Sequence, residues 1–246
     1  MKKSMLGVLT LAGVALFSAA AQADDGLSAN VSLVSKYKFR GQDQSDVTKD
    51  SVPALQGGFD YALGGFYVGS WNSAIGFANG TEMDLYGGYK GKVSVLDYDV
   101  GVLQYYYPGT GGQTFNVTEV YGQLGWEFIT AKYSVTVSDD YFGLKEGKST
   151  GYLDISANYE IVKGLTLNAH VGQTFLSGDA KSNPANQFFG PAANEAPVNY
   201  TDYKLGVTYD IGKGFTVSGA AVGANKKNIW GDANKSRLIL ALNKSM

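Results

Sequence analysis

His170 is the only histidine in the chain, so it is the only imidazole available as a general base. A catalytic histidine needs a nucleophile beside one ring nitrogen and an orienting group beside the other. Its neighbours Ala169 and Val171 are apolar, and no recognisable serine motif accompanies them. We therefore interpret His170 as a polar side chain on a strand and predict no catalytic residue.

Two pairs of carboxylates have a spacing that acid–base hydrolysis would also use. Glu82 and Asp84, and likewise Asp97 and Asp99, are two residues apart. On a β-strand this spacing places both carboxylates of a pair on one face. A polar face that carries solvated charges is the simpler interpretation of both pairs.

No cofactor or metal site is predicted. The chain has no cysteine, and one histidine cannot build a multi-histidine centre. Residues 143–149 are similar to a phosphate-binding loop but are one residue short of it, and they connect two predicted strands without a following helix. We expect this segment to be an exposed loop.

Residues 1–23 are expected to be a secretory signal peptide, followed by one domain at 24–246. Lys2 and Lys3 precede an apolar stretch, and a small-x-small cleavage pattern ends at Ala23. Removal of the two lysines changes the net charge from −2 to −4. This acidic balance argues against a nucleic-acid partner.

The rest of the chain alternates apolar and polar residues with the period of two that half-buried strands show. Short and long connections alternate between these segments, which is the layout of an up-and-down barrel with both ends on the periplasmic side. Twelve strands are predicted at 27–40, 54–61, 66–75, 81–90, 96–107, 115–128, 131–142, 151–161, 165–175, 202–211, 215–223 and 236–246.

Charge and aromatic positions favour a membrane barrel over a soluble periplasmic β protein. Along each strand, the alternate positions that hold mainly polar residues are termed the polar parity, and the positions between them the apolar parity. Of 21 charged residues in these strands, 19 lie on the polar parity, and the exceptions are Asp139 and Lys244. Aromatic residues of the apolar parity gather at both strand ends, as in the interfacial belts of membrane proteins. They include Phe59, Tyr67, Trp126 and Tyr159 at the turn-side ends and Tyr37, Phe39 and Tyr141 at the loop-side ends. The sequence thus predicts an all-β fold, a closed antiparallel up-and-down transmembrane β-barrel of about twelve strands in the Gram-negative outer membrane.

The charges of the polar parity are expected to line the lumen. Seven are basic and twelve acidic, a difference of −5 that predicts a weak cation preference. We expect a transverse field between a basic wall and an acidic wall, although scattered solvated charges in a plugged lumen remain the alternative. The basic wall comprises Lys36, Lys38, Arg40 and Arg237, and the acidic wall comprises Glu82, Asp84, Asp97, Asp99, Glu119 and Glu127.

Twelve strands lie between the filled eight-stranded barrels and the open sixteen-stranded ones, so strand number does not decide whether the lumen is open. Inward tyrosines could narrow it. The long segment 176–201 could fold into the mouth or lie outside. The tyrosines expected to point inward are Tyr86, Tyr105, Tyr107 and Tyr121.

Several segments resemble the TorF-type porins of proteobacteria. The similar segments run in order through the mature chain and include 34–41 (VSKYKFRG), 52–62 (VPALQGGFDYA), 82–88 (EMDLYGG), 98–109 (YDVGVLQYYYPG) and 200–207 (YTDYKLGV). The resemblance implies a small outer-membrane barrel that acts as a channel. It supplies no substrate.

The sequence leaves three functions open. Passive diffusion of small polar solutes or ions is favoured, followed by a structural or adhesive barrel without an open pore and then by a barrel enzyme that modifies lipid. Expected partners are outer-membrane lipid, the permeating solutes and the barrel assembly machinery.

Overall fold

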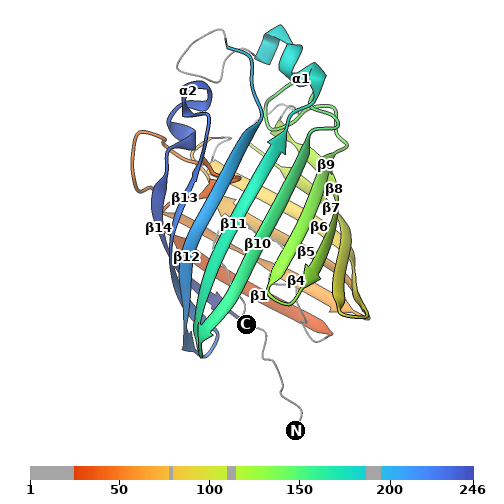
Figure 1. Ribbon diagram of the computed structural model, residues 1–246, viewed down its shortest axis with the longest axis vertical. Helices are drawn as coiled ribbons and strands as arrows, with labels where there is room; N and C mark the ends of the chain where they lie inside the picture. Colours follow the sequence, from red (N-terminus) through yellow and green to blue (C-terminus); the bar gives the residue numbers. More distant parts are fainter. Residues whose placement is uncertain (1–24, 78–79, 110–114, 187–194) are drawn as a thin grey trace.

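The computed structural model describes residues 25–77, 80–109, 115–186 and 195–246, which form a β-barrel (Figure 1). The expected signal peptide at residues 1–23 lies outside the described part. The barrel strands are β1 (Gly26–Val34), β4 (Ala54–Leu63), β5 (Phe66–Ala74), β6 (Thr81–Val93), β7 (Leu96–Tyr106), β8 (Val117–Trp126), β9 (Ile129–Thr136), β10 (Gly151–Val162), β11 (Leu165–Phe175), β12 (Tyr200–Gly212), β13 (Phe215–Ala224) and β14 (Arg237–Ser245).

Within the described residues, these twelve strands close into one antiparallel barrel. Each strand pairs with the next along the chain, and β14 pairs with β1 from Asn30↔Ser245 to Val34↔Ala241. Closure leaves no unpaired strand edge, which a lipid environment requires. The predicted closed antiparallel barrel of about twelve strands is confirmed.

The two ends of the barrel differ in their connections. Tight turns occupy the end at which the chain enters, whereas longer loops and short helices occupy the opposite end (Figure 1). None of the described residues belongs to a helix with the length and apolar character needed to cross a membrane. The helical elements are α1 (Gly178–Ser182), η4 (Pro184–Asn186), α2 (Lys227–Trp230) and η5 (Gly231–Asn234).

Apolar side chains cover the outside of the barrel. In β14, Leu240 is 58% exposed, whereas the neighbouring Ile239 is 9% exposed because it points inward. Leucines 238 and 242 repeat the outward orientation, and Asn243 is buried. An apolar outer surface with a polar interior is the arrangement that a bilayer selects.

The predicted aromatic belts hold only in part. Phe59, Trp126 and Tyr159 are exposed on the outer surface, as expected. Tyr67 was expected to face outward but is buried, and its hydroxyl donates to the Asp99 carboxylate at 2.6 Å. Pairing of this buried hydroxyl with a lumenal carboxylate explains its inward orientation. Tyr37, Phe39 and Tyr141 also lie inside, in connecting segments rather than in the strands of the barrel.

Two predicted strands end six residues earlier than expected. The strand expected over 27–40 ends at Val34, where the chain turns into the barrel. The strand expected over 131–142 ends at Thr136, so Asp139 lies in a loop and is not an exception to the charge pattern of the strands. In both cases the alternating pattern continues beyond the point at which pairing stops.

Candidate functional site

The first loop, residues 35–53, folds into the lumen instead of extending β1. It contains a small hairpin of β2 (Lys38–Phe39) and β3 (Gln42–Asp43). Arg40 and Gly41 form its two-residue turn, with φ of 46° and 75°. Positive φ at both central residues is the requirement of a type I′ hairpin turn. Arginine rarely adopts positive φ, so this turn costs conformational free energy at Arg40.

Gly41 fits the hairpin tip closely against one wall of the barrel. A Cβ atom on Gly41 would lie 2.5 Å from the Cβ of Asp202 on β12 and 2.7 Å from the carbonyl oxygen of Gly223 on β13. Only a residue without a side chain permits this approach. The hairpin is therefore held against β12 and β13.

From this tip, Arg40 reaches β8 in another part of the wall. Its Nη1 and Nη2 donate to Oε1 and Oε2 of Glu119 at 2.9 and 2.7 Å. The Arg40 side chain is 4% exposed, and its Cζ lies 4.1 Å from the centre of the Tyr152 ring. This two-point contact, termed the Arg40–Glu119 pair, connects the first loop to the far wall. Burial opposes the charge on Arg40, but Glu119 and two nearby tyrosines outweigh it and raise its pKa.

The other predicted basic residues surround a carboxylate of the same loop. The Nζ atoms of Lys36 and Lys38 lie 3.3 and 2.7 Å from the Asp43 carboxylate, and the Nε of Arg237 lies 3.3 Å from it. All four side chains are buried. Burial lowers the pKa of Lys38 despite its contact with Asp43. These cations form a buried ionic cluster, not a solvated basic wall.

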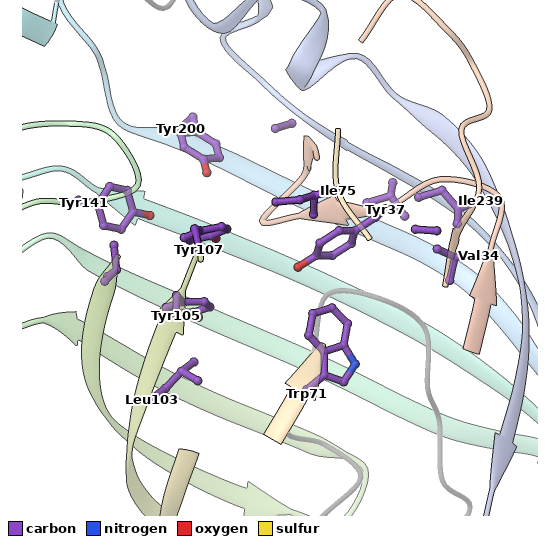
Figure 2. Close-up of a cluster of buried hydrophobic side chains, with 14 of the residues drawn as sticks. Val34, Tyr37, Trp71, Ile75, Leu103, Tyr105, Tyr107, Tyr141, Tyr200 and Ile239 are labelled. Carbon is purple, nitrogen blue, oxygen red and sulfur yellow. The ribbon is translucent and has the colours of Figure 1, made fainter. Parts of the chain in front are cut away.

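Aromatic side chains fill the space around the loop. Figure 2 shows Tyr37 and Trp71 on one side and Tyr105 and Tyr107 on the other. The Tyr37 and Trp71 rings meet edge to face with 5.6 Å between their centres. Together with Leu103 they belong to one buried cluster. The buried apolar cluster thus includes side chains that occupy the lumen at the loop end of the barrel.

His170 lies in the lumen between two carboxylates. Its Nε2 is 2.7 Å from Asp202 Oδ1, and its Nδ1 is 3.3 Å from Asp154 Oδ1. Ser156 lies 3.2 Å from Nδ1 but donates its proton to Asp154 at 2.6 Å. A ring that faces carboxylates at both nitrogens is favoured as the doubly protonated cation, which cannot accept a proton. This geometry suits an internal ion pair and does not form a serine–histidine catalytic arrangement.

The predicted acidic residues divide into an inner and an outer group. Glu82, Asp84, Asp99 and Glu119 are buried inside the barrel. Asp97 is instead exposed near the tight turns and pairs with Lys92 at 3.0 Å. Glu127 lies outside the strands, exposed in the turn between β8 and β9 with a φ of 53°. Glu127 therefore does not line the lumen from a strand, as was expected, because it lies in a turn. Asp97 lies at the exposed start of β7, two residues before the buried Asp99, so its contribution to the lumen stays a prediction.

Sequence reasoning missed two residues that hold the first loop in place. Asp43 lies between the predicted strands 27–40 and 54–61, and Tyr152 was not singled out. The one available signal was the Arg40–Gly41 dipeptide, since glycine at the second turn position favours a two-residue hairpin. No group of three or more metal-ligating side chains occurs among the described residues.

The barrel and its interior define a class of protein. Apolar side chains face outward and charged side chains face the lumen of a closed barrel, which is the arrangement of a porin-like outer-membrane β-barrel. Two similar solved structures carry the titles "KdgM porin" and "NanC porin structure in rhombohedral crystal form". The first has a TM-score of 0.55 and 10% identity over 89% of this chain and 99% of that chain. The second has a TM-score of 0.53 and 11% identity over 89% and 98%. At this identity the likeness is one of fold.

The sequence itself assigns the family. A model described as "Bacterial protein of unknown function (Gcw_chp)" matches residues 18–243, so the chain belongs to the Gcw_chp family. No curated protein matches the chain in sequence.

Proposed function

We propose that the chain is an outer-membrane channel for small polar solutes or ions. The observation that supports this most is the concentration of charged side chains inside a barrel with an apolar outer surface. Charges enclosed in this way serve passage of polar solutes and exclude lipid. The likeness of the fold to two structures titled as porins agrees with this function, as does the sequence resemblance to TorF-type porins.

The first loop supplies the selective part of this channel. It brings Arg40 beside Glu119, and Lys36 and Lys38 beside Asp43, inside the barrel. Arg40 of the loop faces Glu119 of the wall, and this pair supports the transverse field expected from the sequence, with its basic side supplied by the loop rather than by a strand. Such a field favours small polar or zwitterionic solutes.

Conductance measurements test this proposal. The mature chain, refolded and added to a planar lipid bilayer, should produce discrete conductance steps, and a salt gradient should give a reversal potential with a weak cation preference. Substitution of Lys36, Lys38 and Arg40 by alanine should strengthen that preference. Clear anion selectivity of the unaltered chain would contradict the assignment of charge to the lumen.

A structural or adhesive barrel is the second candidate. The observation that favours it is the packing of the first loop and its aromatic neighbours within the lumen. A folded protein that never produces conductance steps would support this candidate over the channel. In either function, outer-membrane lipid and the barrel assembly machinery are the proposed partners.

A further inference from the structure

Among the described residues, two buried carboxylates beneath the first loop have no cationic partner within ion-pair distance. Glu82 and Asp84 on β6 are 1% and 0% exposed. Three of their four carboxylate oxygens, Glu82 Oε2 and both Asp84 oxygens, accept no hydrogen bond. No ion pair reaches either residue within the described part of the chain.

Polar and aromatic groups enclose these carboxylates on three sides. Asp84 lies between Trp71 on β5 and Tyr105 on β7 in the strand register. The Tyr37 hydroxyl of the first loop lies 3.4 Å from Glu82 Oε1, and Tyr107 hydrogen-bonds to the same carboxylate. The site is thus formed by adjacent strands and covered by the loop.

The local charge is unbalanced. The charged groups that act on Asp84 are Glu82 and Glu119, which are both acidic. Arg40 is already paired with Glu119 through both carboxylate oxygens. Arg40 and Lys132 both act on Glu119, and neither acts on Glu82 or Asp84, so ionised Glu82 and Asp84 would place two uncompensated negative charges in a buried space. Burial of unpaired carboxylates is strongly unfavourable, so the site requires a counter-charge or protons.

The other buried acids provide the comparison. Asp43 has Lys38 and Arg237, Asp202 has His170, and Asp99 accepts a hydrogen bond from Tyr67. The chain therefore satisfies its buried carboxylates elsewhere by internal contacts. Asp84 is the exception among those named, because both of its oxygens are left without a contact.

We propose that Glu82 and Asp84 bind a hard divalent cation of the Ca²⁺ or Mg²⁺ type. Carboxylate oxygens are the ligands that these ions prefer, and the Tyr37 hydroxyl would add a further oxygen. Because only two carboxylates are available, the ion retains water and binds weakly, with a Kd of about 10⁻⁴–10⁻³ M. This inference rests on the proposed function, since the ion reaches the site through the lumen.

Terbium luminescence tests the site without any conductance measurement. Tb³⁺ emits when a nearby tryptophan is excited, and Trp71 is the strand neighbour of Asp84. The refolded full mature chain in zwitterionic micelles should give saturable emission that Ca²⁺ displaces in the millimolar range and that K⁺ at equal ionic strength does not. The double variant Glu82→Gln with Asp84→Asn should lose this emission.

The exposed Asp97 provides the matched control. Asp97→Asn removes one negative charge at the exposed turn end of β7 and should leave the Tb³⁺ titration unchanged. Equal emission from the unaltered chain and the double variant would overturn the proposal, as would displacement by K⁺ and Ca²⁺ alike. If the double variant does not fold, as judged by its mobility on unheated gels, the single variant Glu82→Gln replaces it. A partial loss of Tb³⁺ emission is then expected, and unchanged emission would contradict the proposal.

The result separates this inference from the channel function. Saturable Tb³⁺ binding by a barrel that never conducts would support the ion site and refute the channel. Conductance by a barrel whose Tb³⁺ emission does not depend on Glu82 and Asp84 would refute only the ion site. In that case, protons shared between the two carboxylates balance the charge.

Discussion

Replacement of Arg40 by glutamine should release the first loop from the far wall of the barrel. Arg40 contacts Glu119 through two hydrogen bonds of 2.9 and 2.7 Å, and both side chains are almost fully buried. Glutamine keeps a polar side chain but removes the charge and the two-point contact. The Glu119 carboxylate is then left buried without its cation.

The expected loss of stability follows from this burial. Removal of one partner from a buried ion pair lowers the free energy of unfolding by about 3–5 kcal/mol, because the remaining charge is uncompensated. The stacking of Arg40 on Tyr152 contributes to the same loss, since a desolvated cation–π contact is worth about 2 kcal/mol. In the double variant with Glu119→Gln no charge is stranded, so its loss should be smaller than the sum of the two single losses by about 2 kcal/mol.

Equilibrium unfolding in denaturant, followed by tryptophan fluorescence in micelles, measures these differences. Lys92→Gln is the control, because the Lys92–Asp97 pair is exposed and its loss should change stability by at most about 1 kcal/mol. In planar bilayers, Arg40→Gln should also raise the conductance of a single channel. Additive effects of the two single substitutions, or an Arg40→Gln variant as stable as the control, would refute the cross-lumen contact.

Three further perturbations address other parts of the structure. Gly41→Ala should displace the hairpin and lower the free energy of unfolding by at least about 1 kcal/mol, because φ at this position is positive and the new Cβ would contact atoms of β12 and β13. Gly122→Ala is the control, since its Cβ would have no neighbour within 4 Å and should leave stability unchanged in the same unfolding assay. Leu240→Lys should lower the free energy of unfolding in lipid by about 2–4 kcal/mol, because it places a charge on the outer surface near mid-strand; no loss would argue against lipid contact there. His170→Asn should lower the free energy of unfolding in the same assay, because its two carboxylate partners lose their cation. It should not change any lipid-modifying activity, since we assign His170 no catalytic role.

Local sequence patterns were sufficient to predict most of the fold. Strand identity depends on alternation within about ten residues, and the predicted 165–175 coincides with β11. Connection lengths gave the strand order because adjacent strands in an up-and-down barrel pair in sequence. Charge on one face and apolar residues on the other then indicated which side meets lipid.

The inserted first loop was not predictable from alternation. The hairpin strand that contains Lys38 is itself extended, so its residues continue the period of two, and the pattern predicts a longer β1 instead of a separate hairpin. Its position in the lumen depends on contacts distant in sequence, with Glu119 on β8 and with Gly223 on β13. Glu127 failed for a different reason, since parity cannot tell a lumenal strand end from the turn that follows it.

The orientation of the barrel wall is the claim on which the whole account depends, and the absence of cysteine makes it directly measurable. Single cysteines placed in turn at residues 238–243 of β14 can carry a fluorophore whose quenching by brominated acyl chains reports contact with lipid. Strong quenching at 238, 240 and 242 with weak quenching at 239, 241 and 243 is the predicted result. Uniform quenching along the strand, or strong quenching at the odd positions, would contradict it.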